Sequence, residues 1–239
     1  LGSDLGPGVL DNFKKEMPDR FFMEGVSEQS IIGLSAGLAM EGFVPYVNTI
    51  ATFITRRCFE QVIVDLSLHN LPVKLIGNGG GLVYAPLGPT HQAIEDLSIM
   101  RSIPNMSILS PCDAVEMEAL MKQTVEYKSP LYIRLARGGD QIVTKKDEKV
   151  EIGKGNLKII PEDHLFITTG VMTQIAIEAS NLLKKVKKIN VGVLHLGTVK
   201  PLDKKLLLEW IPKVKKIVTV EENVLSGGFG SSILEFTSE

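Results

Sequence analysis

Glu28 is the residue in this sequence whose surroundings best suit acid–base chemistry. It follows Ser27, a residue type that caps helix N-termini, and precedes an apolar, glycine-containing run over residues 31–42. This spacing predicts a mostly buried helix from Ser27 to Met40. A carboxylate in its first turn is stabilised by unpaired backbone N–H groups and by the helix dipole. Ordinary helix electrostatics would therefore explain Glu28 as well as a catalytic role would.

Four sequence blocks together resemble the transketolase family. Residues 25–29, Gly-Val-Ser-Glu-Gln, are similar to the family's GxxEQ stretch. Residues 49–62 contain two phenylalanines and two arginines, residues 88–96 read GPTHQAIED, and residues 220–230 end in Gly-Gly-Phe-Gly. The blocks occur in the family's order and span almost the whole chain. A single GxxEQ would be a weak signal, but four blocks in register are specific.

The resemblance implies thiamine diphosphate as the cofactor. Glu28 matches the glutamate that hydrogen-bonds to the aminopyrimidine ring, which then serves as the base that deprotonates the thiazolium. A charge-assisted hydrogen bond of this kind is worth roughly 1.5–3 kcal/mol. Positioned acid–base groups contribute on the order of 10²- to 10⁴-fold in rate. Replacement of Glu28 is therefore expected to remove most turnover.

The resemblance also assigns other site residues. Phe53 lies where the family places an aromatic ring against the pyrimidine, although a lone phenylalanine is more commonly a core residue. Arg56 aligns with an arginine near the cofactor, whereas Arg57 could equally be a solvated helix start. His91 falls on the histidine that faces the substrate, where an imidazole can pass protons. Arg137 matches an arginine that grips a substrate phosphate, but it could instead pair with a carboxylate.

Several other polar residues have no such pattern. His69, His164 and His195 are predicted to be structural or surface histidines. Glu95 and Asp96 follow the GPTH sequence and are predicted to be structural or helix-surface charges.

The elements that must position these side chains alternate between strands and helices, which predicts an α/β fold with mostly parallel sheets flanked by helices. We expect a pyrimidine-binding domain over residues 1–140, a linker over 141–162, and a C-terminal domain over 163–239 that is either abbreviated or incomplete. Ligands should gather beyond the carboxyl ends of the strands. Expected strands span residues 20–23, 44–50, 71–76, 106–110, 131–135, 165–169, 191–195 and 217–220. Expected helices span residues 27–40, 57–69, 91–102, 113–126, 173–186, 203–210 and 229 onward.

The sequence also departs from the family. Leu87 stands where transketolases carry an aspartate before GPTH, and residues 77–86 lack the arginine that deoxyxylulose-phosphate synthases use for phosphate. The glycine-rich residues 77–81 could cradle a phosphate, but they match no established motif. The family's GDG…N motif, which holds Mg²⁺ and the diphosphate, has no counterpart, because residues 139–141 read Gly-Asp-Gln. We therefore expect a partner chain to supply that motif and Mg²⁺.

Composition limits the other possibilities. The chain has 239 residues, 44% hydrophobic content and a net charge of −2, without a long basic or acidic run. These values predict a globular protein without affinity for nucleic acid or membranes. Cys58 and Cys112 are far apart, which argues against a disulfide framework or a zinc motif. A cytoplasmic location is the default expectation.

The leading hypothesis is the C-terminal subunit of a transketolase-like transferase that moves a two-carbon ketol unit between sugar substrates. It would be active only with an N-terminal transketolase-type subunit, as a homodimer or heterotetramer. One alternative is the β subunit of a 2-oxo acid dehydrogenase decarboxylating component. Another is a non-catalytic assembly or regulatory relative.

Overall fold

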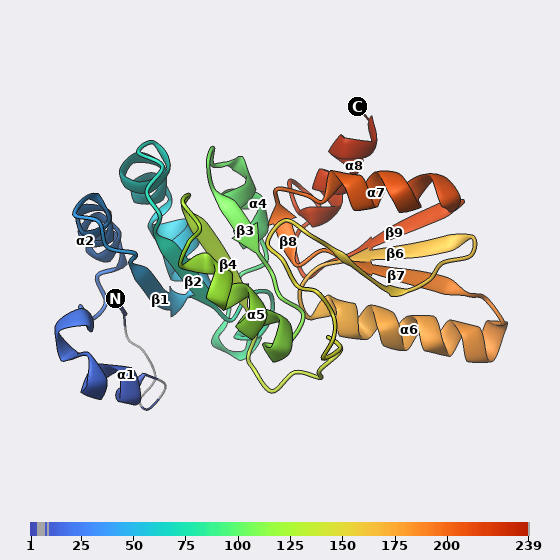
Figure 1. Cartoon of the computed structure of the whole chain (residues 1–239), viewed down its shortest axis with the longest axis horizontal. Coiled ribbons are helices and arrows are strands. Elements are labelled where there is room, and N and C mark those ends of the chain that lie inside the picture. The colour runs from blue at the N-terminus through green and yellow to red at the C-terminus, as the bar shows by residue number, and fades with distance from the viewer. Residues whose placement is uncertain (4–7, 9, 239) are drawn as a thin grey trace.

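The computed structural model describes residues 1–3, 8 and 10–238, and its elements form two α/β units side by side (Figure 1). The predicted fold class is confirmed: each unit has a mostly parallel sheet with helices on both faces. No helix in these described residues is both long enough and apolar enough to cross a membrane.

The first sheet has the strand order β1-β2-β4-β3-β8. Its neighbours are parallel except for the pair β3 and β8. The strands are β1 (Tyr46–Ile50), β2 (Lys74–Asn78), β4 (Leu131–Leu135), β3 (Ser107–Leu109) and β8 (Thr198–Lys200). The short edge strand β8 comes from the second half of the chain and was not predicted. The two halves are therefore joined through the first sheet as well as through the connecting chain.

The second sheet has the strand order β5-β7-β6-β9. The strands are β5 (Asn156–Ile159), β7 (Val191–His195), β6 (His164–Thr168) and β9 (Lys216–Val220). Strand β5, antiparallel to β7, lies inside residues 141–162, which were expected to be only a linker. Its residues are all partly exposed, so it lacks the buried apolar run that would have identified it.

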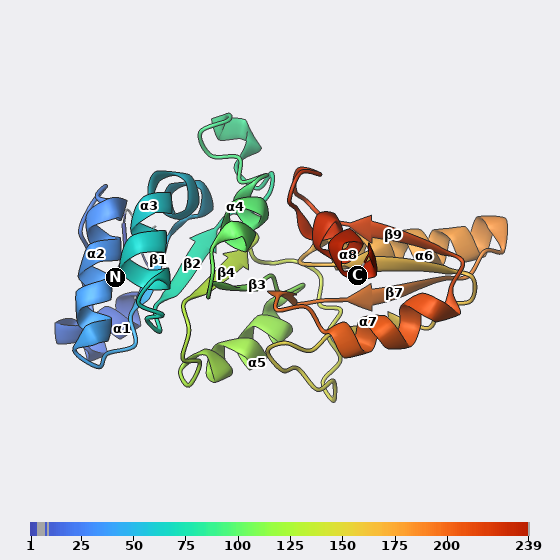
Figure 2. The same cartoon turned by 90° about the horizontal axis from the view of Figure 1, so that it is seen from above.

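The helices of the first unit are α1 (Asp11–Glu16), α2 (Glu28–Met40), the short α3 (Phe59–Gln61), α4 (Asp96–Ser102) and α5 (Ala114–Thr124). Helix α3 is flanked by π-helical turns at Phe53–Arg57 and Val62–Ser67. Helices α4 and α5 lie on opposite faces of the first sheet (Figure 2). The second sheet is covered by α6 (Met172–Lys187) on one face and by α7 (Lys204–Trp210) and α8 (Phe229–Ser238) on the other (Figure 1).

Three local predictions were wrong. The strand expected at residues 20–23 is only an isolated bridge between Gly2 and Met23, after a 3₁₀ turn at Pro18–Arg20. The Ser27 hydroxyl does not cap α2, because it donates to the carbonyl oxygen of Glu24 instead.

The third wrong prediction is the helix expected from residue 91. Helix α4 begins only at Asp96. Ala93 exchanges two 2.9 Å backbone hydrogen bonds with Gly81, so the chain around it is extended and cannot yet turn into a helix.

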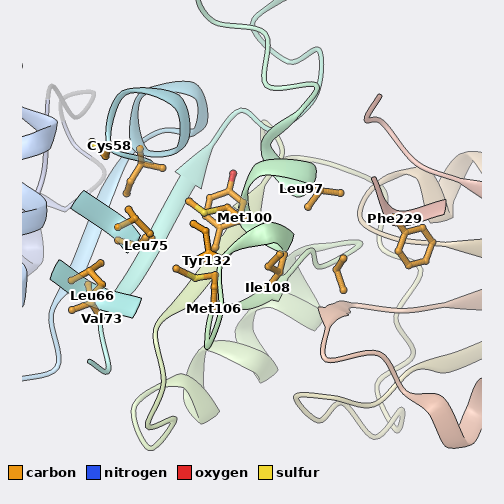
Figure 3. Packing of buried hydrophobic residues seen from close by; sticks show 14 of the residues in the cluster. Cys58, Leu66, Val73, Leu75, Leu97, Met100, Met106, Ile108, Tyr132 and Phe229 are labelled. Carbon is orange, nitrogen blue, oxygen red and sulfur yellow. The ribbon is translucent and has the colours of Figure 1, made fainter. Parts of the chain in front are cut away.

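Alternating strand residues supply two apolar clusters on the first sheet. Leu75, Ile108 and Tyr132 point to one face, and their chain neighbours belong to a smaller cluster on the other. The larger cluster includes both Leu97 of the first unit and Phe229 of α8 in the second (Figure 3). Full burial of such a side chain stabilises the fold by roughly 1.5–3 kcal/mol. A shared core therefore holds the two units together beneath the polar contacts described below.

Candidate active site

Glu28 opens α2 and is buried, with 3% of its surface exposed. Its carboxylate accepts hydrogen bonds from the Ser3 hydroxyl at 2.9 Å and from the Arg57 guanidinium at 2.6 Å. Burial by itself would raise the pKa of Glu28, but hydrogen bonds from its own backbone N–H, from Arg57 and from Ser3 lower it overall. Glu28 is therefore ionised at neutral pH. It can accept another hydrogen bond, because two carboxylate oxygens offer about four acceptor positions.

A row of cationic and aromatic side chains leads away from Glu28. The Arg57 guanidinium lies 4.4 Å from the centre of the Phe53 ring. Phe53 meets His91 edge-on, with ring centres 5.2 Å apart and an interplanar angle of 67°. The Tyr84 ring lies 6.5 Å from His91 in a similar arrangement. The structure thus brings Glu28, Phe53 and His91 into one cluster from three separate sequence blocks.

Arg56 faces the segment that carries His91. Its guanidinium forms an ion pair with Glu95 and donates hydrogen bonds to the carbonyl oxygens of Pro89, at 2.8 Å, and Gln92. The hydrogen bond to Glu95 raises the pKa of Arg56. These contacts give Arg56 a task visible in the structure, which is to hold the GPTH segment against the helical turns after β1.

Two members of the cluster were not assigned from sequence. Arg57 was left open between a site residue and a solvated helix start, and nothing in its spacing separated it from its neighbour Arg56. Ser3 carried no signal, because its contact with Glu28 joins residues 25 positions apart. The chain before α2 reaches Glu28 by pairing Gly2 with both Met23 and Asn48.

The glycine run at residues 77–81 is closely packed by the protein's own side chains. A Cβ atom on Gly77 would lie 2.6 Å from the Tyr132 hydroxyl, and one on Gly79 would lie 2.1 Å from the Tyr84 ring. Gly79 also has a φ of +74°, which favours glycine. Close packing and backbone conformation therefore explain these two glycines without a bound phosphate.

A buried polar network lies beneath this loop. Asp96 accepts hydrogen bonds from Arg134 at 2.8 Å and from the Tyr132 hydroxyl at 2.7 Å. All three side chains are buried, and Asp96 is a structural charge, in keeping with one of the two roles expected from sequence. Burial would lower the pKa of Arg134, but Asp96 raises it overall. Arg134 also donates to the carbonyl oxygen of Glu222 at 2.8 Å, which links the network to the second unit.

Arg137 makes no hydrogen bond or ring contact with the aromatic row among the described contacts. It follows β4, is exposed, and lines a hollow of about 230 Å³ together with Asn78 and Asp113. The residues lining this hollow do not include Phe53 or His91. The hollow adjoins the carboxyl ends of β2 and β4, where parallel sheets commonly bind ligands.

His195 takes part in a second polar cluster, buried between the two units. Its ring bonds to Glu116 at 2.8 Å and to the Thr173 hydroxyl at 2.7 Å. Glu116 also accepts a 2.6 Å bond from the backbone N–H of Cys112. Cys112, Glu116 and His195 are close enough to ligate a metal ion, but hydrogen bonds already link the imidazole and carboxylate, and Gly197 packs against both. We interpret the cluster as a structural contact, as predicted for His195.

Both cysteines are buried and free. Burial raises the pKa of Cys58 to about 12 and also raises that of Cys112. Neither thiol therefore ionises at neutral pH, and neither is a candidate nucleophile.

The two units correspond to two domain families. The model of the transketolase pyrimidine-binding domain matches residues 1–139, and that of the transketolase C-terminal domain matches residues 153–239. These matches define a protein with a cofactor-binding α/β domain followed by a second α/β domain. The chain belongs to the transketolase family, which confirms the resemblance seen in the sequence.

Individual relatives agree with this assignment. The chain is 40% identical over 235 residues to 1-deoxy-D-xylulose-5-phosphate synthase of Clostridium perfringens, covering 98% of this chain but only 38% of the synthase. It is 37% identical over 236 residues to a transketolase family protein, y4mN, of Sinorhizobium fredii, covering 98% of this chain and 68% of that protein.

Solved structures point the same way. A split gene transketolase, described as an inactive beta4 tetramer, has a TM-score of 0.90 and 34% identity, and the match covers 100% of this chain and 78% of that one. A transketolase from Pichia stipitis shares the fold, with a TM-score of 0.74 over 83% of this chain and 30% of that one. The pyrimidine-binding domain implies thiamine diphosphate as the cofactor.

Proposed function

We propose that this chain supplies the pyrimidine-binding and C-terminal domains of a transferase that moves a two-carbon ketol unit between sugar substrates. The observation that carries the proposal is the ionised, buried carboxylate of Glu28 at one end of a row containing Phe53 and His91. When bound between Glu28 and Phe53, thiamine diphosphate would supply the nucleophilic carbon needed for ketol transfer.

The residues present fit the aminopyrimidine end of the cofactor. The Glu28 carboxylate would accept a hydrogen bond from the protonated ring nitrogen, and Arg57 and Ser3 would keep this carboxylate ionised and correctly oriented. Phe53 would pack against the heterocycle, and ring packing adds about 0.5–1.5 kcal/mol beyond area burial. Arg56 would act indirectly on the site, because it holds the loop that carries His91.

The substrate side would be formed by His91 and Arg137. His91 would donate or accept a hydrogen bond at a substrate hydroxyl or carbonyl, which an imidazole can do near neutral pH. Arg137, exposed beside the hollow after β4, would bind a substrate phosphate through its planar guanidinium.

The diphosphate and Mg²⁺ would be bound by a partner, an N-terminal transketolase-type subunit with the GDG…N motif. The likeness to a split gene transketolase over the full length of this chain supports that arrangement. The assembly would be a homodimer or a heterotetramer. We expect the assembled enzyme in the cytoplasm.

The test is to assemble the chain with its diphosphate-binding partner and to measure two-carbon transfer from ketose donors to aldose acceptors. The Glu28→Ala variant should lose turnover on the order of 10²- to 10⁴-fold while its circular dichroism spectrum stays unchanged. Glu118→Ala is the matched control, because Glu118 is exposed on α5 and pairs only with Lys122 in the described contacts. This control should retain full activity.

Two results would overturn the proposal. One is unchanged turnover in Glu28→Ala. The other is an assembled enzyme that forms 1-deoxy-D-xylulose 5-phosphate but transfers no two-carbon unit between sugars, which would match the name of the synthase relatives instead.

A further inference from the structure

Two adjacent glutamates after β9, Glu221 and Glu222, form hydrogen bonds in different parts of the molecule. Glu221 stays within its own unit, where its carboxylate accepts 2.6 Å hydrogen bonds from the backbone N–H groups of Phe229 and Gly230 at the start of α8. Glu222 reaches the other unit, where its carboxylate accepts a 3.1 Å hydrogen bond from the backbone N–H of Leu82. The two side chains are of the same type but therefore have separate tasks.

Glu222 lies tightly against the start of the loop that carries His91. A Cβ atom on Gly81 would lie 2.0 Å from the Glu222 carboxylate, so glycine is required for this close approach. The φ of Gly81 is +70°, which also favours glycine. The backbone carbonyl of Glu222 is held in turn by Arg134 at 2.8 Å.

The loop over residues 82–92 is closed at its base. Gly81 and Ala93 exchange two backbone hydrogen bonds of 2.9 Å, and Arg134 donates to the carbonyl oxygen of Ala93 at 3.2 Å. Next to this closure, Val224 donates a 2.7 Å backbone hydrogen bond to Ile94. The segment after β9 therefore runs along both ends of the loop.

We infer that Glu222 is a positioning residue: through Leu82 it fixes the base of the loop over residues 82–92 and so sets the place of His91 against Phe53. Besides the pairing at its base, the loop is held by Arg56 from the first unit near its end and by Glu222 from the second unit at its beginning. The C-terminal domain would thereby act on the site without contacting cofactor or substrate. The catalytic part of this inference rests on the proposed function.

The first test measures amide hydrogen exchange in the unliganded full chain and does not depend on turnover. Loss of a hydrogen bond to a charged group in Glu222→Ala should speed exchange at Leu82 by about tenfold or more. Glu222→Gln keeps a side-chain oxygen that can accept the hydrogen bond. The exchange rate at Leu82 in this variant should therefore be close to that of the unmodified chain. Glu221→Ala should leave Leu82 unchanged and speed exchange at Phe229 and Gly230 instead.

The second test uses the chain assembled with its partner. Glu222→Ala should lower kcat by about tenfold or more, because a small displacement of a site group is costly, while thiamine diphosphate affinity stays unchanged. Glu222→Gln should restore kcat.

Exchange at Leu82 that is unaltered in Glu222→Ala would overturn the inference, as would faster exchange with an unaltered kcat. Since exchange is measured without turnover, its outcome is separate from the Glu28→Ala test of the proposed function.

Discussion

Two of the polar contacts that join the units of this chain differ in burial and in task. Near the site, Arg134 and Asp96 are buried, but the carboxylate of Glu222 is only half buried and binds a loop backbone. Between the sheets, Glu116 and His195 are both buried and bind each other. The Glu116–His195 contact is entirely buried between the units, whereas the contact near the site extends through Glu222 to the loop that carries His91.

This difference predicts different responses to mutation. A buried charge that loses its partner costs roughly 3–5 kcal/mol, because it stays desolvated without compensation. A half-buried carboxylate that binds one backbone N–H group contributes less, and its loss should act locally. Variants at each contact can therefore separate a contact that stabilises the fold from one that positions a loop.

The largest effect is expected for Arg134→Met. This change keeps much of the side-chain volume but leaves Asp96 buried and without its ion-pair partner. The free energy of unfolding should fall by roughly 3–5 kcal/mol, measured by urea denaturation. Glu118→Ala is the surface control and should change it by less than about 0.5 kcal/mol. If the free energy of unfolding of Arg134→Met falls by less than about 1 kcal/mol, the Arg134–Asp96 ion pair does not stabilise the contact near the site.

An intermediate and pH-dependent effect is expected for Glu116→Gln. Burial would raise the pKa of Glu116, but His195 and the Cys112 backbone N–H lower it overall. A lowered pKa means that this carboxylate contributes stability above pH 4.5, its ordinary pKa, and that the contribution is lost as pH falls further. Glu116→Gln should therefore cost about 1–3 kcal/mol at pH 7 and less at pH 3.

Urea denaturation at both pH values checks this prediction. Glu222→Ala, at the contact near the site, is measured in the same way for comparison. An equal loss in Glu116→Gln at pH 7 and pH 3 would show that the charge of Glu116 does not stabilise the contact between the sheets.

The smallest effect is expected for Glu221→Ala. This change removes the carboxylate that caps α8, and loss of a helix cap costs about 1 kcal/mol. Thermal unfolding should show this modest loss, with exchange in residues 82–92 unaltered. If that loop exchanges faster in this variant, the two neighbouring glutamates do not have separate tasks.

Much of the fold could be predicted because strong local patterns agree with the tertiary structure. The buried apolar strands β2, β4, β6 and β7 were predicted within about three residues at each end. Strands β5 and β8 were missed, because β5 is only partly buried and β8 is a short edge strand whose pairing with β3 joins residues distant in sequence. The start of α4 was missed because the Ala93 pairing with Gly81 is set by residues distant in sequence.

The candidate site divides in the same way. Glu28, Phe53 and His91 were selected because each lies in a motif of residues adjacent in sequence, and the structure places the three in one row. The contacts of Ser3 with Glu28 and of Glu222 with Leu82 join positions 25 and 140 residues apart. No local pattern encodes such contacts.

The amino-acid sequence alone determined the family, the α/β class and the three motif residues, because these depend on residue types at short, regular spacing. Tertiary structure alone decided which arginine meets Glu28, what fills the space beside the glycines of residues 77–81, and which carboxylate of the second unit reaches the loop. The physical reason is that hydrogen bonds and close packing depend on distance in space, which folding sets between segments that are far apart along the chain.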